Sequence, residues 1–392
     1  MSEKIHCQIC GQEVHAIHVH LKEAHQDVSI ADYKKMFPEA PLLSEVAIAH
    51  IAKRKGEKAQ KIETAKMADG GAVTGVDGVV PKSFAAKRPF HEVFGVGKIK
   101  SALSSKGEPI PISVIVNSSP SDMVPQSSED YVYDIEELKN VILALELNIP
   151  CYVWGHKGSG KSELFEQIAA RTGREYVRVQ HTVNTEESHI VGQWTVKDGH
   201  TVFGLGPLPL AMQNGWMYCA DEYDFALPSV LSVYQAVLEG KSLMIKEADA
   251  VNRVIKPHPD FRIVATGNTN GSGDETGLYQ GTNIQNSANY DRFGMVIHKQ
   301  YMSKSAEVQI LQNRVGLVKE DAEKMVEFAA LVREAYDGAK ISDVISPRTL
   351  IFASKIGVKR GSFRNGLKLS FINKLTKVDR EICDGLAQRI FG

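Results

Sequence analysis

The feature that most constrains the fold of this chain is a phosphate-binding loop. Its residues match the pattern G-x-x-x-x-G-K-[ST] in full, and they are Gly155, His156, Lys157, Gly158, Ser159, Gly160, Lys161 and Ser162. Glycines let backbone N–H groups turn toward phosphate oxygens in conformations that a side chain would block. In such a loop the lysine places a positive charge on the β- and γ-phosphates, and the serine hydroxyl binds Mg²⁺. The pattern therefore predicts a site for a nucleoside triphosphate and a metal ion.

The segments on either side predict the strand and the helix that such a loop requires. Residues 150–154 are a short apolar run, as expected of a buried parallel strand. In residues 162–169, Leu164, Phe165 and Ile168 follow helical spacing. The loop thus leads into a helix N-terminus, where the helix dipole favours anions. This context argues against a chance match in a glycine-rich loop.

Two further apolar segments end in polar residues and predict neighbouring strands. Residues 216–220 are followed by Asp221 and Glu222, and residues 261–267 are followed by Asn268. We expect Asp221 to hold the metal ion, directly or through water, and Glu222 to polarise the attacking water. Asn268 would hydrogen-bond that water or the γ-phosphate. The alternatives are two solvated acids at a strand end and an asparagine that opens a turn.

Two arginines downstream are candidates for contacts with the nucleotide. Arg292 lies beyond the predicted strands and is a candidate arginine finger, which would reach the γ-phosphate of a neighbouring subunit. Arg348 follows Pro347, and because proline can begin a helix, Arg348 is expected on a first helical turn. For either arginine alone, a surface salt bridge is the alternative.

In this order, the loop, the acid pair, the asparagine and the two arginines resemble the core of an AAA+ ATPase. Four longer stretches resemble, more narrowly, the MoxR-like ATPases and the small ATPase subunit of aerobic cobaltochelatase, over about residues 113–392; they are residues 221–224, 254–261, 277–282 and 346–349. The resemblance implies an α/β fold, an AAA+ P-loop core with a parallel sheet and a C-terminal helical lid.

The resemblance also implies an activity and an assembly. It implies an ATP hydrolase that uses ATP and Mg²⁺ and forms a homo-oligomeric ring of six subunits, with ATP at the subunit interfaces. The roles that it implies are phosphate binding for Lys161, Mg²⁺ binding for Ser162 and Asp221, the Walker B pair for Asp221 and Glu222, sensor 1 for Asn268, a finger supplied in trans for Arg292 and sensor 2 for Arg348.

Two segments resemble the β-hairpin insertions of this clade. They are residues 193–204 and 241–255, and Lys197 to His200 is a turn signal between β-prone runs. Such hairpins usually face the pore of the ring or a partner protein. ATPases of this clade commonly work with a partner that carries a von Willebrand A domain.

The N-terminal region contains a separate group of possible metal ligands. The spacing C-x2-C-x9-H-x4-H joins Cys7, Cys10, His20 and His25. Two thiolates and two imidazoles form a closed set that is typical of a structural Zn²⁺ site. We expect the histidines on a helix at residues 18–24, about one turn apart. His15 and His18 are alternative ligands, and a reduced cysteine pair beside unrelated histidines is the alternative to a zinc site.

The same spacing, with residues 28–38, resembles the Ros/MucR type of zinc finger, a DNA-binding family. Residues 1–45 hold four lysines and seven acidic residues, a net charge of −3, whereas affinity for duplex DNA comes mainly from neutralised phosphates. Residues 46–68 hold six basic residues and two glutamates, a net charge of +4, and could compensate as a helical arm. We favour a finger that docks a protein, with DNA binding as the alternative.

Length and composition bound the organisation. A chain of 392 residues predicts two to three domains, and its net charge of −1 argues against a dedicated nucleic-acid coat. Without a disulfide pattern, a signal peptide or an apolar run of 18 residues, we expect a cytoplasmic protein with no membrane span. The expected domains are a zinc finger (1–45), a helical or flexible linker (46–125), an α/β nucleotide-binding domain (126–302) and a helical lid (303–392).

Three functions are compatible with these features. The first, which we favour, is a ring ATPase that remodels or activates a partner protein, with the zinc finger as a docking module. The second is a DNA-directed ATPase, which DNA-stimulated turnover would support. The third is an assembly protein that binds ATP without turnover.

Overall fold

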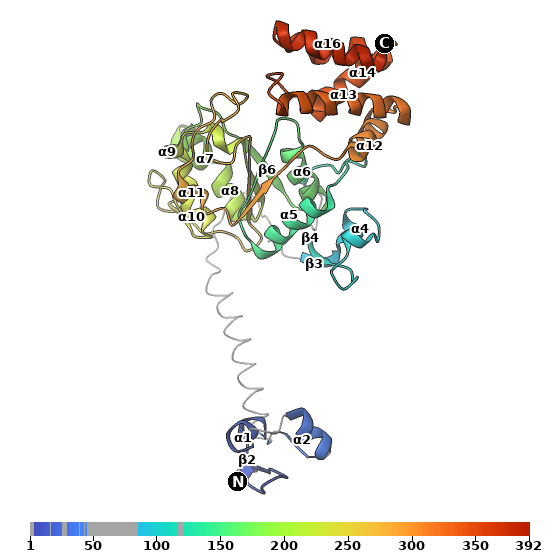
Figure 1. Ribbon diagram of the computed structural model, residues 1–392. Coiled ribbons are helices and arrows are strands. Elements are labelled where there is room, and N and C mark those ends of the chain that lie inside the picture. Colours follow the sequence, from blue (N-terminus) through green and yellow to red (C-terminus); the bar gives the residue numbers. More distant parts are fainter. Residues whose placement is uncertain are drawn as a thin grey trace. The chain divides into compact units, whose positions relative to one another are not determined.

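The computed structural model describes residues 4–15, 17–25, 30–38, 40–42, 44, 85–116 and 121–392. The chain divides into two compact units, Met1–Pro81 and Lys82–Gly392 (Figure 1). The basic arm expected at residues 46–68 lies outside the described residues. Among the helices that are described, none is both long and apolar enough to cross a membrane.

The first unit is small and has a core of its own. Its elements are β1 (Ile5–His6), β2 (Glu13–Val14), α1 (Ile17–Ala24) and α2 (Ile30–Met36). The two strands pair antiparallel, with Ile5 opposite Val14. Cys7, Ile17, Leu21 and Tyr33 form the core. The Tyr33 hydroxyl accepts a hydrogen bond from the Gln8 N–H at 2.9 Å, which ties α2 to the turn that carries the cysteines.

A five-stranded parallel sheet forms the centre of the second unit, as the AAA+ resemblance predicts. Its order is β13-β5-β12-β9-β6. The strands are β5 (Cys151–Trp154), β6 (Tyr176–Gln180), β9 (Met217–Asp221), β12 (Arg262–Gly267) and β13 (Met295–His298). Because all strands run in one direction, their carboxyl ends lie at one edge of the sheet, where polar side chains can converge.

Helices cover both faces of this sheet (Figure 1). α5 (Ile135–Leu147) and α6 (Lys161–Arg171) pack against the face that carries Cys151, Val153 and Cys219. The opposite face, with Tyr152 and Tyr218, packs against α7 (Glu187–Val191), α8 (Pro207–Asn214), α9 (Pro228–Leu231) and α10 (Gln235–Leu238). Strands buried on both faces explain why the sequence shows continuous apolar runs rather than alternation.

Residues 85–116 correct the expected linker. They form β3 (Ala85–Pro89), α4 (Phe90–Val93) and β4 (Pro111–Ile115), with β3 and β4 antiparallel. Phe90, Phe94 and Ile112 join the same core cluster as the buried face of α5. Burial of these apolar side chains removes their surface from water and so stabilises the packing of this segment on the domain.

Two β-hairpins occupy the positions of the expected insertions. One is formed by β7 (Gly192–Lys197) and β8 (His200–Leu205), and the other by β10 (Leu243–Met244) and β11 (Val254–Ile255). The first turn has Asp198 at φ +52° and Gly199 at φ +77°, the pattern of a two-residue turn that matches strand twist. The Trp194 indole N–H donates to the Glu247 carbonyl at 2.9 Å, so the hairpins are joined.

The C-terminal part is helical, as the lid prediction requires (Figure 1). Its helices are α12 (Lys304–Val315), α13 (Lys319–Asp337), α14 (Pro347–Arg360), α15 (Phe363–Ser370) and α16 (Lys377–Phe391). Four of them begin at a serine or threonine whose hydroxyl accepts a backbone N–H of the first turn; these caps are Ser303, Ser346, Ser362 and Thr376. The side chains that follow helical spacing in α13 all lie in the lid core: Ala322, Met325, Val326, Ala329 and Val332.

Candidate active site and metal centre

The phosphate loop connects β5 to α6 at the carboxyl edge of the sheet. Gly158 and Gly160 have φ angles of +70° and +83°, in the left-handed region that glycine adopts without strain. A Cβ at Gly155 would lie 2.1 Å from the Lys299 carbonyl oxygen. Three glycines of the motif are therefore required by the backbone path itself.

A cavity of about 700 Å³ opens in front of this loop. The predicted residues that line it are Lys157, Gly158, Ser159, Gly160, Lys161, Ser162, Asp221, Glu222, Asn268 and Arg348. Its other walls include the apolar side chains Val132, Met302, Ile310 and Ile351. The lining thus combines charged side chains, which can bind phosphates, with apolar side chains, which can contact a base.

Lys161 is held at the base of the cavity. Its Nζ donates to the carbonyls of Gly155 at 2.8 Å and His156 at 3.2 Å, and to Asn268 Oδ1 at 3.0 Å. Burial lowers the pKa of Lys161 to about 8, although the carboxylates of Asp224 and Asp221 oppose this change. The predicted lysine and asparagine are therefore in direct contact.

Asp221 is surrounded by hydrogen-bond donors. Its side chain is 1% exposed, and Oδ1 accepts from the Ser162 hydroxyl and, at 2.6 Å, from the Thr266 hydroxyl. Oδ2 accepts from Arg178 Nε at 2.8 Å. A serine hydroxyl beside a carboxylate offers the hard oxygen ligands that suit Mg²⁺. Ser162 and Asp221, which the sequence predicts as a pair, lie together.

Glu222 has a different environment from its neighbour. Its backbone φ is +51°, an uncommon value for a residue other than glycine. The Glu222 N–H donates to Thr266 Oγ1 at 3.1 Å, and Oε2 accepts from Gln180 Nε2 at 3.0 Å. Strained backbone of this kind occurs frequently at functional sites, and here it turns Glu222 away from its strand and into the cavity lining.

Asp224 positions the asparagine. It is fully buried, and Oδ2 accepts from the N–H groups of Asn268 and Thr269, both at 2.8 Å, and from the Thr269 hydroxyl at 2.9 Å. Burial raises the pKa of Asp224, while these hydrogen bonds act in the opposite direction. Asp224 therefore fixes the backbone at the end of β12, from which the Asn268 side chain reaches Lys161.

Residues of the lid complete the cavity. Arg348 lies on the first turn of α14, as Pro347 predicts, and lines the cavity with Arg314 of α12. Arg314 forms an ion pair with Glu163 of α6. A Cβ at Gly158 would lie 2.6 Å from the Ser346 Cβ, so the lid packs directly on the phosphate loop.

The two variable residues of the loop, His156 and Lys157, make further contacts. The Tyr279 hydroxyl accepts from the Lys157 N–H at 2.9 Å and lies 2.9 Å from His156 Nδ1. The His156 ring is stacked near Tyr301, with centroids 5.8 Å apart. Burial, followed by the charge of Lys161, lowers the pKa of His156.

Arg292 does not join the other predicted residues. It follows α11 (Ser287–Tyr290), and its Nε donates to Glu239 Oε1 at 2.7 Å. Another of its nitrogens, Nη1, donates to the Ala288 carbonyl at 2.6 Å. Arg292 is absent from the cavity lining in the part of the chain that the structure describes.

Several polar side chains that contact the predicted residues were not predicted from the sequence, among them Arg178, Gln180 and Asp224. The first two alternate with Val177 and Val179 in β6. That alternation was the available signal, because polar residues at every second position of a strand share one face. For Asp224 the sequence offers only its place after the acid pair.

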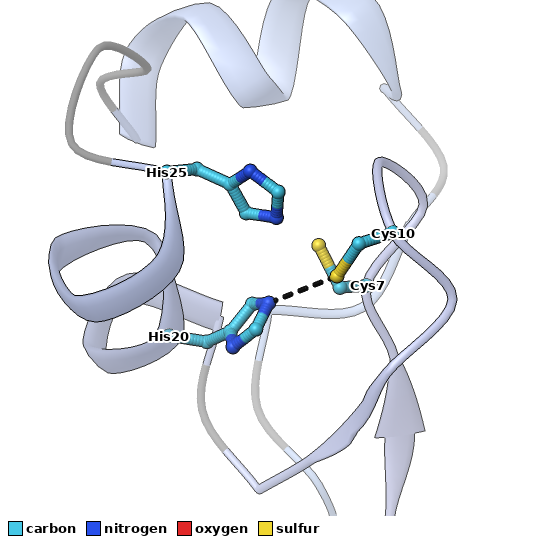
Figure 2. Close-up of side chains that lie close together, drawn as sticks. All are labelled: Cys7, Cys10, His20 and His25. Carbon is cyan, nitrogen blue, oxygen red and sulfur yellow. Dashed lines mark hydrogen bonds between the residues drawn. The ribbon is translucent and has the colours of Figure 1, made fainter.

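The four predicted zinc ligands of the first unit converge (Figure 2). One ligand atom from each of Cys7, Cys10, His20 and His25 lies within 4.8 Å of all the others. Cys10 Sγ is 3.1 Å from His20 Nε2. The buried Nε2 of His25 has no hydrogen-bond partner among the described residues.

Two further observations bear on this cluster. His15 Nδ1 lies 2.9 Å from the Ser44 hydroxyl, which gives this alternative ligand a different partner. The side chain of His18 lies outside the described residues. Burial acts to raise the pKa of Cys7, but hydrogen bonds from the backbone of Ile9 and Cys10 outweigh it and lower the pKa, which favours a thiolate.

Comparison with known proteins matches both parts of the second unit. Residues 151–293 match the AAA domain (dynein-related subfamily), and residues 307–390 match the CbbQ/NirQ/NorQ C-terminal domain.

Of three individual relatives, two match over more of the chain than the two family models do, and one matches over less. The chain is 36% identical over 280 residues to the aerobic cobaltochelatase subunit CobS from Sinorhizobium sp, covering 69% of this chain and 83% of that protein. It is 30% identical over 179 residues to midasin from Dictyostelium discoideum, covering 45% of this chain and 3% of that protein. It is 24% identical over 272 residues to the protein NorQ from Paracoccus denitrificans, covering 69% and 93%.

Proposed function

Because the chain belongs to the AAA+ ATPases, in the MoxR-like branch with CobS and NorQ, we propose that it is a ring-forming motor that remodels or activates a partner protein. The family matches and the relatives confirm the resemblance that the sequence showed, and with it ATP hydrolysis. The ring, the partner and the roles of single residues are the proposal.

One observation carries this proposal: the nucleotide cavity lies between the α/β part and the lid. Lys161 and Asp221 line it from the α/β part, and Arg314 and Arg348 line it from two lid helices. A nucleotide that contacts both parts changes its charge and its length when the γ-phosphate leaves. The lid would then lose part of its contact, so hydrolysis would change the angle between the two parts.

Within the cavity, each polar residue has a distinct proposed task. Lys161 would bind the β- and γ-phosphates in place of its hydrogen bonds to the loop carbonyls. Glu222 would orient and polarise the attacking water, and Asn268 would hold the γ-phosphate or that water. Ser162 and Asp221 would hold Mg²⁺, which neutralises charge on the phosphate oxygens when it is bound.

The position of Arg292 supports a site shared between copies. Its guanidinium contacts Glu239 and the Ala288 carbonyl rather than the cavity of its own chain. If Arg292 contacts a γ-phosphate, that phosphate would have to belong to the nucleotide of a neighbouring subunit. A head-to-tail contact of this kind closes into a ring when its rotation divides a full turn, and we propose six subunits.

The first unit supports a separate docking function. The orphaned Nε2 of His25 and the nearby thiols of Cys7 and Cys10 fit a tetrahedral Zn²⁺ ion, which takes nitrogen and sulfur ligands. We propose that zinc holds this small core together and that the finger docks a protein, such as one with a von Willebrand A domain.

The test is the ATPase rate of the purified chain, with and without duplex DNA, together with its mass in solution with ATP. We expect a ring and turnover that is independent of DNA. Lys161→Ala is the control, because without the lysine nucleotide binding should be lost. A monomer in saturating ATP would contradict the ring, and DNA-stimulated turnover would favour a DNA-directed ATPase.

A further inference from the structure

The edge strand β6 holds both carboxylates that end β9. In the parallel register, Arg178 lies opposite Cys219 and Gln180 lies opposite Asp221. Arg178 reaches diagonally along the sheet to Asp221, and Gln180 contacts Glu222. The contact with Asp221 has a geometry that bears on how this carboxylate could bind a metal ion.

The two oxygens of Asp221 have separate partners. Arg178 contacts only Oδ2, through Nε at 2.8 Å and Nη2 at 2.5 Å. The hydroxyls of Ser162 and Thr266 contact only Oδ1. Because Arg178 holds Oδ2 while the two hydroxyls hold Oδ1, the carboxylate is restrained from both sides, and Oδ1 lies beside the serine hydroxyl that the phosphate loop provides for Mg²⁺.

The burial of Asp221 makes its ion pair with Arg178 important. Asp221 is 1% exposed, whereas the Arg178 side chain is 46% exposed and lines the cavity. A buried carboxylate whose ion-pair partner is removed becomes an uncompensated charge and tends to turn toward other donors. The arginine is therefore the contact that both compensates Asp221 and fixes its orientation.

We propose that Arg178 is a positioning residue that orients the Asp221 carboxylate for the metal ion. The proposal rests on the proposed role of Asp221 as a metal ligand. Groups that hydrogen-bond to metal ligands typically contribute about 10–100-fold to metal affinity. Loss of the guanidinium should therefore weaken metal binding while leaving the phosphate contacts of the loop intact.

The test measures Mn²⁺ binding directly. The full chain is loaded with a non-hydrolysable ATP analogue, and loss of the free Mn²⁺ signal is followed by electron paramagnetic resonance. Arg178→Met should raise the dissociation constant for Mn²⁺ about tenfold or more, and Arg178→Lys should raise it less, since an ammonium keeps the charge but loses the fork. Affinity for the ATP analogue in EDTA should not change in either variant.

The matched control is Arg171→Met. Arg171 pairs with Glu129 in the same unit and is not among the residues that line the cavity, so this variant should bind Mn²⁺ like the original chain. Unchanged or tighter Mn²⁺ binding in Arg178→Met would overturn the proposal, since tighter binding would mean that the arginine competes with the metal. If Arg178→Met does not fold, the shift in Arg178→Lys decides.

Asp221→Asn separates this proposal from the one on which it rests. If Asp221→Asn leaves Mn²⁺ affinity unchanged, the carboxylate is not a metal ligand and both proposals fail. If Asp221→Asn weakens Mn²⁺ binding and Arg178→Met does not, only the role of Arg178 fails. Addition of Arg178→Met to Asp221→Asn should have no further effect, because the arginine is proposed to act through that carboxylate.

Discussion

At the residue scale, the two adjacent carboxylates at the end of β9 illustrate how environment separates tasks. Asp221 is buried and accepts hydrogen bonds on both oxygens, whereas Glu222 turns out of the strand with φ +51°, and its Oε2 accepts from Gln180. A buried carboxylate that is held by donors on both oxygens has a fixed orientation, which suits a group that positions a metal ion. One that faces the cavity with a free oxygen is suited to accept a proton from water.

The first prediction concerns Glu222. Glu222→Gln keeps the size and the polarity of the side chain but removes the oxygen that can accept a proton. We expect ATP binding to be retained and turnover to fall by about 10²–10⁴-fold. Phosphate release and binding of a fluorescent ATP analogue measure the two effects. Glu166→Gln, in a second carboxylate of the cavity lining, should reduce turnover far less, and unchanged turnover in Glu222→Gln would exclude Glu222 as the water-activating group.

The second prediction concerns His156. Burial and then the charge of Lys161 lower its pKa in the folded chain, against the weaker opposing effect of Asp337. As pH falls below the unfolded value of about 6.5, the unfolded chain binds the proton first. The stability that neutral His156 contributes is therefore present above this pH and is lost as pH falls toward its folded pKa.

The check is a comparison of melting temperatures at about pH 8 and about pH 5.5. Between these two pH values, the melting temperature of the original chain should fall further than that of His156→Gln, in which this titration is absent. The groups that face His156 are Tyr279, Tyr301, Tyr336, Asp337, His298, Lys157 and Lys161. Since the variant leaves them in place, their titration affects both chains. Equal losses would show that His156 is not the titrating group.

At the element scale, the proposed zinc ligands Cys7, Cys10, His20 and His25 link β1, β2 and α1, which have a small core of their own. Among the described residues of this unit, the buried apolar side chains besides Cys7 are Ile17, Leu21 and Tyr33. So few buried side chains rarely hold a domain of this size folded, and a structural metal often supplies the missing stability. Removal of one ligand should therefore unfold the first unit without changing the ATPase core.

The third prediction follows from this dependence. Cys10→Ser should lose the zinc that we expect to copurify with the chain at one equivalent, and protease should then cleave within residues 4–44. Turnover of ATP without a partner should not change. His15→Gln is the matched control, because His15 contacts Ser44 rather than the cluster, and it should retain zinc. Metal analysis by mass spectrometry measures both variants, and full zinc content in Cys10→Ser would contradict the assignment.

Local signals within one element could be predicted from the sequence, whereas contacts between distant elements could not. The phosphate loop, the helix after it and the acid pair could be predicted because their signals are local, namely fixed spacing and the helical periodicity of Leu164, Phe165 and Ile168. Arg178 could not be assigned to Asp221, since their contact depends on β6 pairing with β9 across 43 residues. The burial of Phe90 and Phe94 could not be predicted either, because the helix that packs against them begins more than forty residues later.

At the scale of the whole molecule, we propose that the active site is shared between two copies of the chain. Most of its predicted residues line one cavity, but Arg292 forms an ion pair with Glu239 outside it. If a neighbouring copy supplies this arginine, the loss of Arg292 and the loss of Glu222 damage different partners of the same interface. Two inactive variants should then restore activity to each other when they share a ring.

The fourth prediction is this restoration. Arg292→Ala and Glu222→Gln should each be inactive alone. In a random equal mixture, about a quarter of the interfaces should combine an intact Glu222 with an intact Arg292 from the next subunit, and turnover should recover to about that fraction. The rate of phosphate release from rings whose subunits have been mixed and allowed to exchange measures this recovery. The control partner is the double variant Arg292→Ala/Glu222→Gln, which joins the ring but lends no arginine and should give no recovery with Arg292→Ala. Equal rates with both partners would place Arg292 outside the catalytic interface, and the shared site would have to be abandoned.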